Sequence, residues 1–294
     1  MAAPSAMMHD PYASRRGDSA VAERFDPVLW GSSTGPLSAD ELVRFEADGF
    51  IVKERLFREE ELAAMTEELG RLPSRYAERS REAIVSEPGT GVIRSIFRVH
   101  RVSPVFEKIA HDPRLSNTAC QILGSDVYVH QSRINFKRAF DGRAFPWHSD
   151  FETWHMEDGM PRMRALSASV LLTENTPVNG PLMLIRGSHK RYVRCTGETP
   201  RDHYRESLRN QRYGVPSNEA LTQLTAEGGL VQALGPPGSV IFFDCNTMHG
   251  SSGNMSPYPR HNVFFVFNST ENALRAPFCG LPPRPEFLAE RSNS

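Results

Sequence analysis

The sequence predicts one mainly β domain, a sandwich or a barrel, with helices packed around it. From about residue 126 onward, short apolar runs rich in β-branched and aromatic residues alternate with Gly, Pro and Asn. This pattern is typical of strands joined by turns. The stretch before residue 126 carries amphipathic segments with helix-capping residues. A chain of 294 residues is long enough to bury a sizeable core.

Three helices are expected before the strands. Ser38 and Glu41 form a capping box at the start of the first, and Gly49 suits its C-terminal end. Residues 58–72 and 113–124 have the apolar spacing of two further amphipathic helices. Residues 1–25 are small, polar and Pro-containing, so we expect a flexible arm there and a single domain over 26–294.

Strands are expected within five apolar stretches, with a polar helical or loop insertion between the third and the fourth. In the first stretch, Gln131, Arg133, Asn135 and Lys137 share one face because successive side chains of a strand alternate. That polar face either meets water or lines the lumen of a barrel, and periodicity leaves both possibilities open. The stretches span 126–140, 163–173, 180–190, 238–253 and 261–269, and the insertion spans roughly 195–230.

Composition favours a cytoplasmic enzyme or binding protein. The formal net charge of -1 gives no indication of a nucleic-acid partner. No apolar run approaches the roughly 18 residues that a membrane-spanning helix needs, and the N-terminus lacks the apolar region of a secretory signal. The four cysteines are scattered, without a CxxC pair, as expected for reduced core residues.

The stretch FPWHSDFETWHMEDG, residues 145–159, crowds histidines, carboxylates and tryptophans together. His148 and Asp150 are two residues apart, so on a strand both side chains project to the same side. His249 ends a strongly apolar strand about one hundred residues later and can complete a set of two histidines and one carboxylate. Such a facial triad leaves positions open on iron(II), whereas zinc typically takes four ligands.

Arg260 stands eleven residues after His249, just before the last predicted strand. An arginine there can bind a carboxylate in a bidentate fork, and Ser251, on the same face as His249, can donate a second hydrogen bond. The order H-x-D, His, Arg therefore predicts an iron- and 2-oxoglutarate-dependent oxygenase. Each piece alone has a plainer explanation, such as a chance H-x-D, a core histidine or a surface arginine.

Other histidines and motifs favour no competing chemistry. His100, His111 and His203 are expected on the surface, and His189 in a turn bonded to backbone. The chain has no H-E-x-x-H of a zinc protease, and its GSSG run at 250–253 is too short for a nucleophile elbow. The GTGVIR stretch at 89–94 ends in arginine where a dinucleotide fingerprint needs glycine.

The segment FPWHSDFETWHMEDGMPRMRALS resembles the signature of ectoine hydroxylases, members of the phytanoyl-CoA dioxygenase superfamily. The resemblance extends through NGPLMLIRGSHK, DCNTMHGSSGN and QSRINFKRAFDG to the tail PPRPEFLAE, from about residue 35 onward. One departure is Arg186, where the family tends to have proline. The resemblance implies a double-stranded β-helix, or cupin-like jelly roll, with flanking helices.

The resemblance also implies an activity, the oxidation of L-ectoine to 5-hydroxyectoine while 2-oxoglutarate and dioxygen become succinate and carbon dioxide. Family habit implies a homodimer. Matched position by position, the iron(II) ligands are His148, Asp150 and His249, the 2-oxoglutarate contacts are Lys137, Ser251, Arg260, Phe145 and Ser167, and the substrate contacts are Gln131, Trp154 and Arg284.

Two alternatives stay open at this point, besides a more distant one, a zinc hydrolase, which metal analysis of anaerobically purified protein would settle. One is a dioxygenase of the same superfamily that hydroxylates another small zwitterion or amino-acid derivative. The other is a non-catalytic cupin that binds a metal and a small ligand. Succinate release on adding substrate separates an oxygenase from a binding protein, and assays with ectoine against proline separate the two oxygenases.

Overall fold

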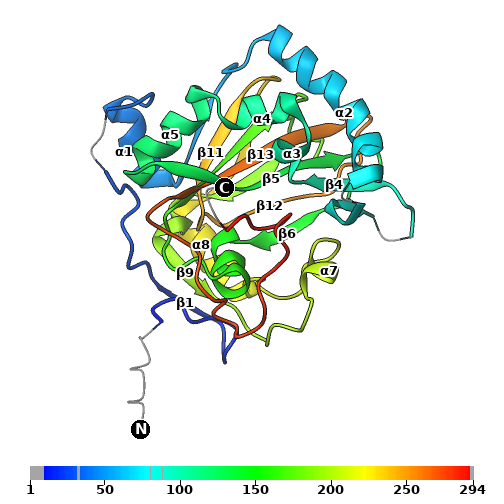
Figure 1. Cartoon of the computed structure of the whole chain (residues 1–294). Helices are drawn as coiled ribbons and strands as arrows, with labels where there is room; N and C mark the ends of the chain where they lie inside the picture. Colours follow the sequence, from blue (N-terminus) through cyan, green and yellow to red (C-terminus); the bar gives the residue numbers. More distant parts are fainter. Residues whose placement is uncertain (1–9, 32–33, 80, 88, 292–294) are drawn as a thin grey trace.

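Two antiparallel sheets face each other in the computed structural model, which describes residues 10–31, 34–79, 81–87 and 89–291 (Figure 1). The large sheet has the strand order β2-β11-β7-β13-β5-β4-β3, and the smaller one the order β10-β8-β12-β6. The large sheet consists of β2 (Phe50–Lys53), β11 (Val240–Asp244), β7 (Ala165–Leu171), β13 (Arg260–Ser269), β5 (Val127–Lys137), β4 (Ile93–Phe97) and β3 (Ile84–Ser86). The smaller sheet consists of β10 (Leu230–Ala233), β8 (Leu182–Ile185), β12 (His249–Ser251) and β6 (Phe145–His148).

This arrangement confirms the predicted fold class. Facing antiparallel sheets of this kind make a jelly roll, and helices lie outside the large sheet. Of the sandwich and the barrel that the strand pattern allowed, the structure shows the sandwich, because no strand pairing within the described residues joins the two sheets. The open edges between the sheets leave room for a pocket.

Alternation along the central strands builds a separate core on each face of the large sheet. In β11, Val240 and Phe242 pack beneath the helices, whereas Ile241 and Phe243 face the smaller sheet. All four side chains are fully buried. A strand buried on both faces has the continuous apolar sequence seen here.

Helices cover the outer face of the large sheet, as Figure 1 shows for α1, α2, α4 and α5. The predicted capping box of α1 is present, with the Ser38 hydroxyl accepting from the Glu41 amide, and Gly49 ends the helix in the left-handed region. The second helix continues beyond residue 72, through Pro73, because Leu72 and Tyr76 anchor it in the core. The helices are α1 (Ala39–Asp48), α2 (Glu59–Arg79), α3 (Val99–Val102), α4 (Pro104–Ala110) and α5 (Pro113–Leu123).

The remaining elements surround the smaller sheet, apart from the 3-10 turn at Arg81–Ala83, which packs against α2. The segment after His148 coils into α6 and a π-helical turn, η2, while the predicted insertion folds into α7 and α8. Their bounds are α6 (Asp150–Thr153), η2 (Trp154–Asp158), α7 (Tyr204–Ser207) and α8 (Asn218–Gly228), with short 3-10 turns at η1 (Arg81–Ala83) and η3 (Ser188–Lys190). None of the helices in the described residues is long and apolar enough to cross a membrane.

The N-terminal segment differs from the flexible arm expected over residues 1–25. Residues 1–9 lie outside the described residues, but β1 (Ala20–Glu23) pairs with β9 (Arg191–Arg194) in a sheet of its own. Tyr12 is fully buried between Phe151 and Tyr192. Composition was misleading because the polar side chains of this segment bond to buried partners far away in the sequence.

Gly159 allows the chain to leave η2, since its φ is 82° and an added Cβ would lie 2.1 Å from the Arg275 carbonyl oxygen. We predict that Gly159→Ala lowers the free energy of unfolding by more than about 1 kcal/mol, because alanine is strained there and the contact forces a shift. Urea denaturation measures the change.

Gly70→Ala is the control, because Gly70 lies inside α2 with open space around it. There alanine should stabilise by about 0.5–1 kcal/mol, and equal effects at both sites would contradict the account.

Candidate metal centre

Two histidines face each other across an antiparallel strand pair. β6 and β12 are hydrogen-bonded neighbours, with His148 directly opposite His249 in the register. The ring centroids are 4.3 Å apart. Side chains opposite each other on one face of such a pair are held close together, so the pairing brings the two imidazoles together.

Asp150 completes the cluster from a different element than expected. The strand ends at His148, and Asp150 is the first residue of α6 rather than a continuation of β6. Its carboxylate nevertheless reaches both rings, with Asp150 Oδ1 3.7 Å from His148 Nε2 and Oδ2 3.9 Å from His249 Nε2. Glu152 does not share this face as a strand would require, since it turns away to pair with Arg15.

Backbone carbonyls orient both imidazoles. His148 Nδ1 lies 2.7 Å from the Pro146 carbonyl oxygen, and His249 Nδ1 lies 2.9 Å from that of Thr247. A carbonyl only accepts, so Nδ1–H donates in each ring and Nε2 offers its lone pair to the cluster. Metal-binding histidines in proteins are commonly oriented in this way, by a hydrogen bond from the ring nitrogen that does not bind the metal.

Charges in the cluster suit a metal ion at neutral pH. Burial, together with the neighbouring His148, lowers the pKa of His249 to about 4, and burial also lowers the pKa of His148. Burial acts to raise the pKa of Asp150, but His249 and Arg133 outweigh it and hold that pKa below its ordinary value. Neutral imidazoles and an ionised carboxylate are the forms that bind metals.

The donor set fits iron(II). One ligand atom from each of His148, Asp150 and His249 lies within 4.8 Å of the others. Two nitrogens and one oxygen on one side of a cation make the facial triad of non-haem iron(II) oxygenases, with positions left for a co-substrate and dioxygen.

The cluster lies in a pocket of about 990 Å³, its mouth included, and most of the predicted site residues line it. Lys137 and Ser167 lie just behind the wall. Lys137 Nζ donates to the Ser251 hydroxyl over 2.8 Å, and the Ser167 hydroxyl donates to Asp150 Oδ2 over 3.4 Å. Ser167 thus contacts the candidate metal ligand itself. Predicted residues in the wall are Gln131, Phe145, His148, Asp150, Trp154, His249, Ser251, Arg260 and Arg284.

The polar face of β5 points into this pocket, which decides between the two possibilities that periodicity left open. Gln131, Arg133 and Asn135 line the cavity, and all three are shielded from bulk solvent. Ile134, on the opposite face, packs in the main core under the helices. The alternation of this strand therefore separates pocket from core, and neither face lies open to water.

One end of the pocket holds two basic side chains that have no acidic partner within the described residues. Lys137 and Arg260 are almost fully buried, and neither forms an ion pair within the described residues. Burial, followed by Arg260 and Arg94, lowers the pKa of Lys137 to about 6. Burial and Arg94 also lower the pKa of Arg260 to about 10. Buried cations without a counter-charge are costly, so this end is suited to binding an anion.

The other end of the pocket combines an indole with an arginine that is already paired. Trp154 is 2% exposed and lines the cavity from η2. Arg284 donates from Nε and one terminal nitrogen to both oxygens of Asp158, over 2.7 and 2.6 Å. Its charge is therefore largely compensated inside the protein, although the side chain also lines the pocket.

Several residues that line the pocket were not among the predicted site residues. Arg133 shares the face of Gln131 and Lys137, so strand alternation was a usable signal for it. Arg94 and His203 come from remote segments without any periodic relation to the triad. His203, expected on the surface, is buried and bonds to Glu157, because the insertion folds back over the pocket. His100 is also buried rather than exposed, against Ser132 and Glu290.

Comparison with known proteins agrees with this geometry. The family described as phytanoyl-CoA dioxygenase (PhyH) matches residues 45–262. The chain belongs to this family. It is 55% identical over 285 residues to the ectoine dioxygenase of Bordetella bronchiseptica, with 96% of this chain and 92% of the relative covered. It is 52% identical over 289 residues to that of Sphingopyxis alaskensis, with 97% and 94% covered.

Solved structures give the same result. EctD from S. alaskensis with 2-oxoglutarate and 5-hydroxyectoine superposes with a TM-score of 0.88 at 48% identity, covering 97% of this chain and 96% of that one. EctD from the same organism with bound Fe gives a TM-score of 0.87 at 47% identity, with the same coverage. These similarities confirm the jelly-roll fold that the family resemblance implied.

We predict that His249→Ala and Asp150→Ala each lose iron(II) binding, because two remaining protein donors do not compensate for the water ligands that the ion gives up on binding. Anaerobic titration of the metal-free chain with iron(II), followed by metal analysis, measures the loss. His111→Ala is the control, since His111 is exposed, lies outside the pocket lining, and bonds through its ring to the Glu107 carbonyl. Undiminished binding in either triad variant would contradict the assignment.

Proposed function

We propose that this chain hydroxylates L-ectoine to 5-hydroxyectoine with iron(II), dioxygen and 2-oxoglutarate, releasing succinate and carbon dioxide. One oxygen atom enters the product and the other enters succinate, so the reaction balances without a further reductant. The observation that carries the proposal is the His148–Asp150–His249 cluster beside an unpaired cationic end of the same pocket. The named relatives support the choice of substrate, at 48–55% identity.

The cationic end is the proposed site for the distal carboxylate of 2-oxoglutarate. Arg260 donates from a terminal nitrogen to the Ser251 hydroxyl over 3.4 Å, and Lys137 donates to the same hydroxyl. An incoming carboxylate would replace or share these bonds and supply the missing negative charge. The Cζ atom of Arg94 lies 3.7 Å from the centroid of the Phe145 ring. Phe145 would offer an apolar surface to the methylene groups of the co-substrate.

The proposed substrate end suits a small ring that carries a delocalised cation and a carboxylate. The indole face of Trp154 attracts a cation. Gln131 donates to the Leu288 carbonyl over 2.6 Å and accepts from Arg133, so its amide is held in one orientation. Arg284 keeps its bonds to Asp158 and presents its remaining edge to the pocket that it lines.

When bound, iron supplies the activation of dioxygen, which no side chain can provide. The protein residues fix which C–H bond faces the metal and limit access of bulk water. His203 and Leu208, from the segment that covers the pocket, contribute to that shielding. The carboxylate of the bound co-substrate would give Lys137 and Arg260 the counter-charge that they lack within the described residues.

An assay with ectoine tests the proposal directly. Purified chain with iron(II), 2-oxoglutarate and dioxygen should convert ectoine to a product heavier by one oxygen, with one succinate per product. His148→Ala should abolish both. Proline in place of ectoine should give little product. Turnover of proline but not ectoine would indicate another dioxygenase of the family, and succinate-free binding would indicate a non-catalytic protein.

The depressed pKa of Lys137 gives a pH dependence to co-substrate binding. Above pH 6 the free amine is increasingly neutral, whereas a bound carboxylate favours its charged form. Binding therefore takes up a proton, and the affinity for 2-oxoglutarate should fall between pH 6 and 9, by at most about tenfold per pH unit. Lys137→Met should bind weakly and independently of pH, whereas the exposed control Lys190→Met should behave as the unaltered chain. A flat profile in the unaltered chain would contradict this role.

We further propose that the protein works in the cytoplasm as a homodimer. The four cysteines are free thiols, in keeping with a reducing compartment. The homodimer rests on the family resemblance. Analytical ultracentrifugation measures the assembly, and a monomer at micromolar concentration would contradict it.

A further inference from the structure

The turn between β11 and β12 bonds to one candidate metal ligand and to the residue that follows another. Its Thr247 carbonyl accepts from the His249 ring, and its Cys245 carbonyl accepts from the Phe151 amide over 2.9 Å. Phe151 directly follows Asp150. Thus a displacement of residues 245–247 would move a histidine and a carboxylate relative to each other.

Asn246 adds a side-chain connection between this turn and the first two ligands. Its Oδ1 accepts from the Ser149 hydroxyl over 2.9 Å, and Ser149 separates His148 from Asp150. Its Nδ2 donates to the carbonyl oxygens of His189 and Arg191, over 2.9 and 2.7 Å. Asn246 is 1% exposed, so each of these bonds replaces one to water and is costly to lose.

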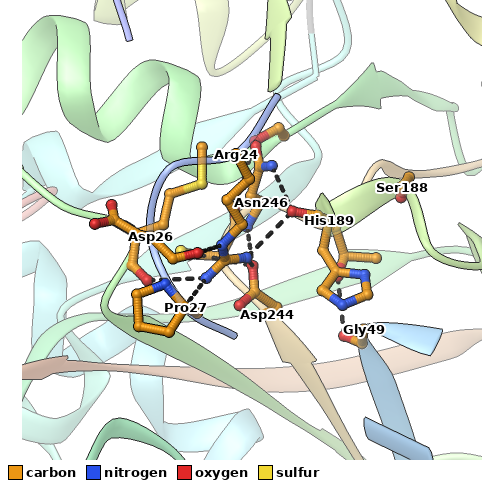
Figure 2. Close-up of polar contacts among 12 residues, drawn as sticks. Arg24, Asp26, Pro27, Gly49, Ser188, His189, Asp244 and Asn246 are labelled. Atoms are coloured by element: carbon orange, nitrogen blue, oxygen red, sulfur yellow. Dashed lines mark hydrogen bonds and ion pairs between the residues drawn. The ribbon is translucent and has the colours of Figure 1, made fainter. Parts of the chain in front are cut away.

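Arg24, from the N-terminal segment, anchors the same turn (Figure 2). Its five N–H groups make five hydrogen bonds, and the side chain is 3% exposed. One bond, of 2.9 Å, goes to Asp244 Oδ1. The same oxygen also accepts from the backbone N–H of Asn246 over 2.8 Å. The other acceptors are the carbonyl oxygens of Asp26, Pro27, Met163 and His189.

The opposite side of the turn is held by α1 and η3. The Gly49 carbonyl accepts from the Asp244 amide and from the Thr247 hydroxyl, each over 2.9 Å. The Ser188 hydroxyl accepts from the Met248 amide over 2.9 Å. In Figure 2, Gly49, Ser188 and His189 lie on one side of Asp244 and Asn246, with Arg24 and Asp26 on the other.

We propose that Arg24 and Ser149 are positioning residues of the metal centre, which act on the ligands through Asp244 and Asn246. The N-terminal segment thereby becomes part of the active-site framework, although none of its described residues belongs to the candidate ligand set. This inference rests on the proposed iron site but not on the identity of the substrate. Groups that orient metal ligands typically contribute 10–100-fold in metal affinity.

The test is an anaerobic iron(II) titration of the metal-free full chain and of two variants. Ser149→Ala removes one hydroxyl and leaves Asn246 Oδ1 without its donor. Arg24→Lys keeps the charge beside Asp244, but three N–H groups cannot reach five acceptors. Each variant should bind iron(II) at least about tenfold more weakly, and the ratio of succinate to hydroxylated product should rise above one.

Two matched controls separate positioning from general destabilisation. Ser103→Ala removes a buried hydroxyl that caps α4, and Arg114→Lys simplifies a multidentate arginine beside Asp112 and Glu61. Neither lines the pocket or contacts the triad within the described residues. Both should lower the melting temperature and leave iron(II) affinity unchanged.

The outcomes are distinct. Weaker iron binding in Ser149→Ala, beyond that of Ser103→Ala, supports the proposal even if Arg24→Lys does not fold. Affinity equal to that of the unaltered chain in Ser149→Ala and in any folded Arg24→Lys overturns it. If the unaltered chain itself binds no iron(II), the metal site and the proposed function fail together with the inference.

Discussion

The candidate metal centre depends on one cross-strand pair, in which His148 lies opposite His249. Antiparallel pairing of β6 and β12 places two imidazoles side by side at the floor of a pocket, and their Nδ1 bonds to backbone carbonyls aim both Nε2 atoms inward. Asp150 is the first residue of α6, two residues after the end of β6, and its carboxylate therefore lies beside both rings. Every functional conclusion depends on this convergence.

Charge compensation explains the crowded segment at residues 145–159. Glu152 and Glu157 pair with the buried guanidinium of Arg15, and Asp158 pairs with Arg284. Asp150 alone of these carboxylates faces the two histidines. The same comparison distinguishes Lys137 and Arg260, which are buried without a carboxylate partner in the described part of the chain and therefore suit an anionic co-substrate.

Much of the fold and of the metal cluster follows from local sequence features. Capping residues placed α1, and short β-branched and aromatic runs placed β5, β11 and β13, because these signals act over a few neighbouring residues. Alternation could not show that the polar face of β5 lines a pocket. A strand face that meets bulk solvent and one that lines a polar cavity carry the same kinds of side chain. Nor could composition reveal that Arg15 and Arg24 are buried, because the carboxylates that pair with them, Glu152 and Asp244, lie more than one hundred residues away in the sequence. The change from strand to helix at Asp150 left the predicted cluster intact although the predicted geometry was wrong there.

Isotope-labelled dioxygen tests the central claim most directly, that one pocket couples both co-substrates at the three-residue centre. With ¹⁸O₂, ectoine and 2-oxoglutarate, mass spectrometry should find one labelled atom in the hydroxylated product and one in succinate. Unlabelled product, or product formed without labelled succinate, would contradict the account.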